Sequence, residues 1–189
     1  MNTVILLLFL FAIFGVIAYV ITIFNGLITL KNDIDKAWAN IDIMLKQRHD
    51  ELPKLLDICK GYMDFERDTL QKITQARSMY QQAVSVDQKA QADQSMTSAL
   101  RGFFAVAENY PQLKANDNFM RLQVRITDLE SQIADRREFY NDSVNTFNIR
   151  IQQLPDTFVA SFMNLTPREM FKVEEADKAD VPMTFSAAK

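Results

Sequence analysis

An uninterrupted apolar stretch near the N-terminus constrains this chain more than any other feature. Val4–Phe24 reads VILLLFLFAIFGVIAYVITIF, which is 21 residues without a charge. A helix of that length rises about 30 Å, the thickness of the hydrocarbon core of a bilayer. A cleaved signal peptide would combine a basic N-terminal region, a shorter apolar stretch and a small-residue cleavage site, and this stretch has none of the three. We therefore expect a short N-terminus (1–3) and a transmembrane helix (4–24).

The charged residues all lie after residue 30. They comprise 21 Lys and Arg and 24 Asp and Glu, with a net charge of −3. So balanced a charge creates no field that would attract nucleic acid, and we expect no nucleic-acid partner. Lys31 and Lys36 follow the apolar stretch closely, whereas no basic residue precedes it. This asymmetry predicts a single-pass protein with its N-terminus outside and its C-terminal part in the cytoplasm.

The composition and the periodicity of the remaining chain favour an all-α fold. Four Gly and five Pro are too few for the frequent turns of a sandwich or barrel. After the apolar stretch, hydrophobic residues recur at alternating steps of three and four, which is typical of a heptad seam; they are Leu27, Leu30, Ile34, Ala37, Ile41 and Met44. We expect residues 25–155 to form an antiparallel four-helix, coiled-coil-like bundle.

His49–Pro53 interrupts this pattern, because proline is poorly tolerated inside a helix. The interruption predicts a turn, with a kinked but continuous helix as the alternative. A turn would leave the first helix much shorter beyond the membrane than its partners. Either a bend at Asn25–Gly26 tilts the bundle across the membrane face, or the first helix continues through Pro53.

The next elements are read from helical spacing. A long second helix should continue through about residue 88. Residues 85–95 are polar and rich in Gln, which indicates a loop or a weak junction. A shorter third helix follows, with apolar positions from Met96 to Ala107, and Tyr110-Pro111 ends it.

Asn116 or Asp117 can cap the last long helix, which should reach about Gln153 before Pro155 stops it. Two segments then complete the chain. The first (156–171) is short and apolar, and it either packs back on the bundle or touches the bilayer surface. The second (172–189) resembles a disordered tail.

The chain lacks the residue sets of common catalytic and metal sites. It contains one His and one Cys, whereas di-metal bundles and zinc hydrolases use paired histidines. Its isolated glycines form no phosphate-binding loop. Cys59 lies among apolar residues and is interpreted as a small buried hydrophobe. We expect no catalytic residues, no metal, no cofactor and no small-molecule substrate, and hence no enzyme.

Six polar residues are candidates for an interaction site or for fixing helix register: Arg48, Glu130, Arg136, Arg137, Tyr140 and Asn141. Arg136 or Arg137 falls where the seam would place an apolar side chain. One interpretation is an Arg whose stem packs in the core while its head pairs with a carboxylate such as Asp42 or Glu66. The other is a binding site for an acidic segment of a partner.

Several motifs resemble the LemA family of bacterial membrane proteins. The matching pieces include Ala37-Trp38-Ala39-Asn40-Ile41, Leu45-Lys46-Gln47-Arg48-His49-Asp50, Leu113-Lys114-Ala115-Asn116 and Arg136-Arg137-Glu138-Phe139-Tyr140-Asn141. The resemblance extends over residues 24–171. Two positions depart from it: Phe24 stands where some members carry a lipid-accepting Cys, and the Gly common after the Pro155 region is replaced near Met163-Asn164.

The resemblance implies a single N-terminal anchor in the bacterial inner membrane, or a membrane derived from it, carrying a long-helix bundle without catalytic residues. Members often lie beside membrane-associated metalloproteases, and one branch is associated with magnetosome membranes. We therefore expect a non-enzymatic membrane scaffold that self-associates or docks another membrane protein. The alternatives are an adaptor for a membrane protease and a membrane-shaping protein.

Overall fold

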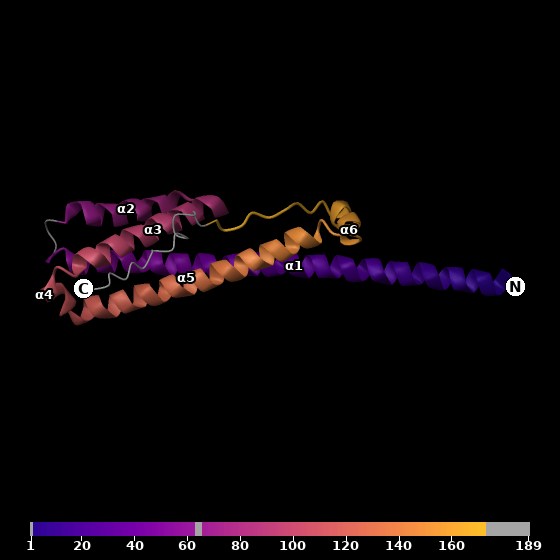
Figure 1. Cartoon of the computed structure of the whole chain (residues 1–189), viewed down its shortest axis with the longest axis horizontal. Helices are drawn as coiled ribbons and strands as arrows, with labels where there is room; N and C mark the ends of the chain where they lie inside the picture. Colours follow the sequence, from indigo (N-terminus) through magenta and orange to yellow (C-terminus); the bar gives the residue numbers. More distant parts are fainter. Residues whose placement is uncertain (1, 63–65, 173–189) are drawn as a thin grey trace, which may run out of the picture.

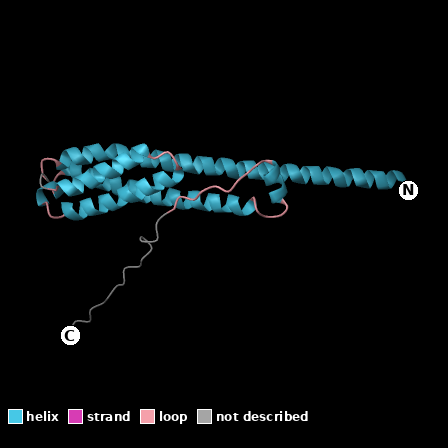
Figure 2. Ribbon diagram, turned by 90° about the horizontal axis from the view of Figure 1, so that it is seen from above, coloured by secondary structure: helices cyan, strands magenta, loops and turns pink. Residues whose placement is uncertain are grey.

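The computed structural model describes residues 2–62 and 66–172, and within them helices joined by turns and one extended segment after the last helix make up the chain (Figures 1 and 2). The elements are α1 (Asn2–Cys59), α2 (Arg67–Gln82), α3 (Val86–Ala107), α4 (Pro111–Lys114), α5 (Asp117–Arg150) and α6 (Asp156–Phe162). The described ranges contain no strand. The prediction of an all-helical chain with a long apolar N-terminal helix is confirmed. The predicted tail lies outside the described residues, apart from Lys172.

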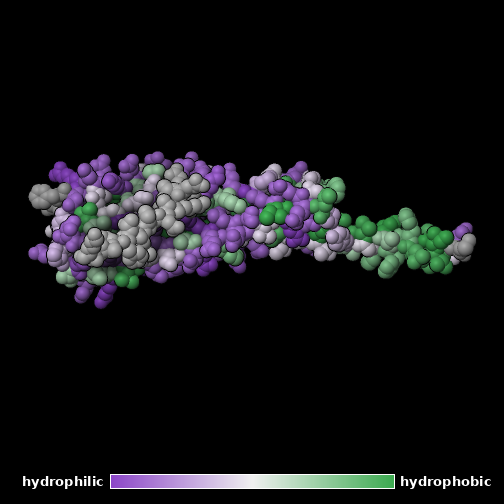
Figure 3. All heavy atoms as spheres, viewed as in Figure 1, coloured by the Kyte–Doolittle hydropathy of each residue, from purple (hydrophilic) through white to green (hydrophobic). Residues whose placement is uncertain are grey.

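Helix α1 is the axis of the molecule. Its first part projects alone (Figure 1), and the side chains of residues 2–22 are exposed. This projecting part is almost entirely hydrophobic (Figure 3), and α1 is the one described helix that is long and apolar enough to cross a membrane. The second part of α1 is flanked by α5 along its length, while α2 and α3 cover its far end.

The turn predicted at His49–Pro53 is wrong, because α1 continues through Pro53 to Cys59. Proline inside a helix costs about 3 kcal/mol. Leu52, Leu55 and Cys59 are fully buried around it, and burial of each large apolar side chain contributes about 1.5–3 kcal/mol. Packing therefore outweighs the local penalty.

Continuity through Pro53 also removes the mismatch in helix lengths. Beyond Phe24, α1 has 35 residues and rises about 52 Å, close to the roughly 51 Å of the 34-residue α5. The helix passes through Asn25 and Gly26 without interruption. Of the two resolutions that the sequence left open, the straight first helix is the one observed.

The second and third helices also have different limits from those predicted. The chain turns after Cys59, α2 ends at Gln82, and α3 begins at Val86. Within the polar segment 85–95, predicted to be a loop or a weak junction, Ser85 is the N-cap residue and residues 86–95 are helical. The helix starts with a capping box in which the Ser85 hydroxyl accepts a hydrogen bond from the Gln88 backbone N–H (3.1 Å) and the Gln88 side chain accepts one from the Ser85 backbone N–H (3.1 Å).

Two apolar cores lie along α1. The proximal core, nearer the projecting part, joins α1 to α5 and α6 and contains Leu27, Ile41, Tyr140, Phe147 and Phe171 among others. The distal core joins the end of α1 to α2, α3, α4 and the start of α5. Cys59 is fully buried there, as expected for a small hydrophobe, and burial raises the pKa of its thiol to about 11.

Asn116 caps α5 as predicted. Its side-chain oxygen accepts hydrogen bonds from the backbone N–H groups of Asn118 (3.0 Å) and Phe119 (3.1 Å). We expect Asn116→Ala to lower the free energy of unfolding by about 1 kcal/mol, because both N–H groups lose their acceptor. Chemical denaturation in detergent, followed by circular dichroism, measures the change. Asn118→Ala is the matched control at an exposed position, and equal effects of the two substitutions would contradict the role of the cap.

Candidate functional site: a buried ionic cluster beside a groove

Asp93 is the central residue of a buried cluster of charges. It lies on α3 with no exposed surface, and its two carboxylate oxygens face different helices. Oδ1 accepts a hydrogen bond from Nη2 of Arg48 on α1 (2.6 Å), and Oδ2 accepts one from Nη1 of Arg137 on α5 (2.7 Å). One carboxylate therefore joins three helices.

Thr97 and Glu130 complete what we call the ionic cluster (Arg48, Asp93, Thr97, Glu130 and Arg137). Nη1 of Arg48 donates to Glu130 Oε1 and to the Thr97 hydroxyl (3.3 Å), while that hydroxyl donates to Glu130 Oε2 (2.7 Å). Two guanidinium groups thus meet two carboxylates, so the formal charges cancel. Such balance is needed because only 3% of Arg48 is exposed, and a buried charge without a partner is strongly destabilising.

The six predicted site residues separate into three groups. Arg48, Glu130 and Arg137 meet in the ionic cluster. Tyr140 and Asn141 lie further along α5 and bind backbone atoms. Arg136 is exposed.

The carboxylates suggested as partners for the Arg pair elsewhere. Asp42 forms an ion pair with Lys89, and Glu66 accepts a hydrogen bond from the Tyr110 hydroxyl (3.0 Å). The partner of Arg137 is Asp93, which sequence reasoning missed because its segment was interpreted as a loop or junction. The spacing of Met96, Leu100 and Phe103, extended backwards along a helix, would have placed Asp93 near an apolar face.

Two asparagines on α5 hold the segment after α6 in an extended conformation. The Asn148 side chain accepts from the backbone N–H of Arg168 (2.8 Å) and donates to its carbonyl (2.9 Å). Asn141 makes the same pair of hydrogen bonds with Phe171 (2.8 and 3.0 Å). Seven helical residues rise about 10.5 Å and three extended residues about 10 Å, so the two spacings match. Tyr140 adds a hydrogen bond from its hydroxyl to the Glu169 carbonyl (2.9 Å).

This asparagine ladder delivers Phe171 to the ionic cluster. The Phe171 ring is buried, with its centroid 6.1 Å from that of Trp38, and the Arg137 guanidinium lies 5.1 Å from the ring centroid. Trp38 also packs against Tyr140, with centroids 5.6 Å apart. Arg137 is therefore positioned by Asp93 through an ion pair and by Phe171 through a cation–π contact.

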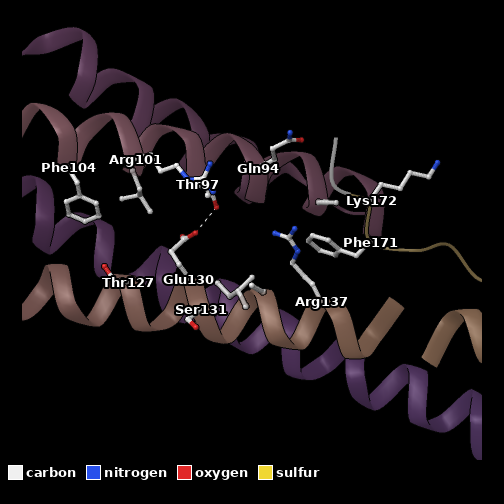
Figure 4. A pocket seen from close by; sticks show the side chains of 14 residues that line it. Gln94, Thr97, Arg101, Phe104, Thr127, Glu130, Ser131, Arg137, Phe171 and Lys172 are labelled. Atoms are coloured by element: carbon white, nitrogen blue, oxygen red, sulfur yellow. Dashed lines mark hydrogen bonds between the residues drawn. The ribbon is translucent and has the colours of Figure 1, made fainter. Parts of the chain in front are cut away.

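A groove of about 580 Å³ lies between α3 and α5 beside the cluster (Figure 4). Three cationic side chains line it (Arg101, Arg137 and Lys172), together with Phe104 near one end and Phe171 near the other. The buried Nε of Arg137 has no hydrogen-bond acceptor within the described part of the chain. The groove thus combines two aromatic rings with three cationic side chains, and this pairing suits an acidic, partly apolar ligand segment.

The groove offers no grouping of residues typical of metal chemistry. Within residues 2–62 and 66–172, no three His, Cys, Asp or Glu side chains are arranged to hold a metal ion. Glu130, the carboxylate in the groove wall, is already bonded to Arg48 and Thr97. The arrangement is suited to binding and to holding helices in register.

An apolar helix that continues into a helical body defines a membrane-associated helical protein. The chain belongs to the LemA family, whose model matches residues 37–185. This match confirms the resemblance inferred from the motifs.

Related proteins of known name come from bacteria. A protein named Protein LemA from Metamycoplasma hominis is 31% identical, over 83% of this chain and 72% of its own length. Magnetosome protein MamQ 2 from Paramagnetospirillum magneticum is 22% identical, over 91% of this chain and 73% of its own length. Magnetosome protein MamQ from Magnetospirillum gryphiswaldense is 20% identical over the same shares.

The central position of Asp93 leads to a prediction. Asp93→Asn removes the charge that two guanidinium groups share, and we expect the free energy of unfolding to fall by about 3 kcal/mol, since a buried pair broken on one side leaves an unpaired charge. Denaturant unfolding in detergent measures the loss. The control is Asp128→Asn, whose ion pair with Arg125 is exposed (3.6 Å) and whose loss should change stability by less than about 1 kcal/mol. Equal effects at the two positions would show that Asp93 does not hold the helices together.

Proposed function

We propose that this protein is a non-enzymatic, membrane-anchored scaffold. Its helical body acts as an antiparallel four-helix, coiled-coil-like bundle, and its α3–α5 groove docks an acidic, partly apolar segment of another membrane protein. The proposed location is the cytoplasmic face of the bacterial inner membrane or of a membrane derived from it.

The pairing of positive charge with aromatic rings in the groove is the observation that carries this proposal: Arg101, Arg137 and Lys172 line it together with Phe104 and Phe171. A carboxylate on a ligand would suit these cations, because hydrogen bonds between charged groups are stronger than neutral ones. Arg101 and Lys172 add positive charge at the groove, while Phe104 and Phe171 supply apolar contact.

Helix continuity supports a scaffold in particular. Arg48 lies about 24 residues beyond Phe24 on the same helix, so the ionic cluster stands about 36 Å from the end of the apolar stretch, measured along α1. A partner segment must reach that far from the bilayer. A domain that holds a groove at a fixed height above the membrane is suited to docking and needs no reaction of its own.

The structure favours docking of a different protein over self-association through the heptad seam. Leu27, Ile34, Ala37 and Ile41 are buried in the proximal core beside α5 of the same chain, so this seam is already covered. A second copy could still occupy the groove. A membrane protease is a further candidate partner, and the relatives named as magnetosome proteins support a role in organising a membrane as the alternative function.

The docking proposal predicts crosslinking from the groove. We expect a photoreactive residue in place of Gln94, in the groove wall, to capture a partner in native membranes. The same residue in place of Gln75, which lies on α2 outside the groove, is the matched control. The mass of the product distinguishes a second copy of this chain from a different protein. Equal capture from both positions, or none from Gln94, would contradict a docking groove.

The charge of the partner segment is tested by Lys172→Glu in the Gln94 crosslinking variant. We expect the yield to fall several-fold, because a carboxylate in the groove repels an acidic segment. Arg136→Glu makes the same charge change at an exposed position outside the groove and should leave the yield unchanged. The sequence after Lys172 begins Val173-Glu174-Glu175, which is itself acidic. A chain ending at Lys172 tests whether this acidic segment competes for the groove. Its removal would raise the yield if the segment competes and would leave the yield unchanged if it does not.

The proposed orientation predicts the labelling of introduced cysteines. Asn2→Cys should react with a membrane-impermeant maleimide added to cells whose outer barrier has been opened and whose inner membrane is intact. Val84→Cys, at a position 90% exposed on the helical body, should react only after the inner membrane is permeabilised. The native Cys59 is buried with a pKa of about 11, which keeps background labelling low. Labelling of Val84→Cys while the inner membrane is intact would contradict this orientation and would place the helical body outside.

A further inference from the structure

Helix α6 presents an exposed apolar face next to the end of the apolar stretch. Leu154, just before it, is 74% exposed, and Phe158 and Phe162 are 71% and 85% exposed. The opposite face of α6 is buried, because Val159 and Ala160 belong to the proximal core. The helix is thus fixed to the body on one side and displays aromatic rings on the other.

The position of α6 is set by Arg150 at the end of α5. Its Nε donates to the Asp156 carboxylate in the first turn of α6 (2.6 Å). Its guanidinium also crosses α1 at Gly26, where an added Cβ would lie 2.7 Å from Nη2. Because Gly26 lets the guanidinium come so close, α6 is held against α1 within a few residues of Phe24.

The level of α6 along α1 coincides with the last turns of the apolar stretch. A groove of about 370 Å³ separates the two helices, and its walls are entirely apolar: Val20, Ile21 and Phe24 from α1, and Phe158, Val159 and Phe162 from α6. In Figure 3 hydrophobic surface gathers where the projecting part of α1 meets the body. If Val20–Phe24 lie in hydrocarbon, the facing rings of α6 lie at the same depth.

The charges around α6 fit a position at a lipid surface. Asp156 is the single charged residue in 151–167, and it is paired with Arg150. Aromatic side chains are favoured at the boundary between headgroups and acyl chains, and helices lying in that plane bury their apolar face about 5–10 Å deep. A polar surface of a partner protein would not match the six apolar residues that line this groove.

We propose that α6 is an interfacial helix whose Leu154, Phe158 and Phe162 insert into the bilayer leaflet next to the body, with lipid acyl chains filling the groove beside Phe24. The inference rests on the membrane anchorage of α1 but not on docking in the α3–α5 groove. The protein would then contact the membrane at two places, and α6 would set the rotation and tilt of the body above the lipid.

Quenching of an introduced tryptophan by lipid tests this proposal. Full-length Phe162→Trp and Phe158→Trp proteins are reconstituted in phosphatidylcholine vesicles that carry bromine near the headgroup end of the acyl chains. We expect the added fluorescence to fall about twofold relative to unbrominated vesicles, because the rings lie at the depth of the bromine. Val84→Trp, at an exposed position in the turn between α2 and α3, should show no quenching, and the wild type corrects for Trp38.

Each other outcome overturns the inference. Emission typical of water, without quenching, would place α6 outside the lipid, and blue-shifted emission without quenching would show that protein covers it. Quenching of Val84→Trp to the same extent as the two α6 variants would show nonspecific contact with vesicles. Flotation of the wild type with vesicles tests anchorage separately, and capture from Gln94 tests the docking function, so failure of α6 insertion is distinguishable from failure of either.

Discussion

The structure depends on one carboxylate shared by two guanidinium groups. Asp93 has no exposed surface, and it is bonded to Arg48 on α1 and Arg137 on α5. Without this charge α3 would place mainly alanines against α1 and α5 in its first half, which gives little register specificity. Ion pairs have directional geometry, whereas small apolar contacts can slide. The ionic cluster thereby holds three helices at one relative height, and the groove wall follows from it.

Features that depend on neighbouring residues could be predicted from the sequence. The cap at Asn116 and the end of α5 before Pro155 arise from local backbone chemistry, and both are present in the structure. Pro53 is the opposite case. Its local preference indicates a break, but buried side chains on either side hold the helix together. The helix over 86–95 gives only a weak hydrophobic pattern, because its buried residues are two alanines and Asp93.

The candidate site shows the same division. Arg137 could be selected because a charged residue on an apolar seam is conspicuous in a sequence, and Arg48 and Glu130 because they belong to groups of polar residues. Their partner Asp93 is distant along the chain, and no local pattern pairs them. The asparagine ladder was equally hidden, since Asn141 and Asn148 bind backbone atoms of an extended segment. The polarity of Asn141 makes it a candidate in the sequence, but its geometry depends on the path of the chain after α6.

The absence of any break in α1 between the apolar stretch and the distal core has a mechanical consequence. A straight helix of about 52 Å beyond Phe24 behaves as a lever, with the bilayer as its support. Bilayers of different thickness tilt membrane helices to different degrees. A change of about 10° would sweep the far end of this lever through about 9 Å. The composition of the lipid could thus alter which neighbours the far end meets, without any change of conformation within the helices.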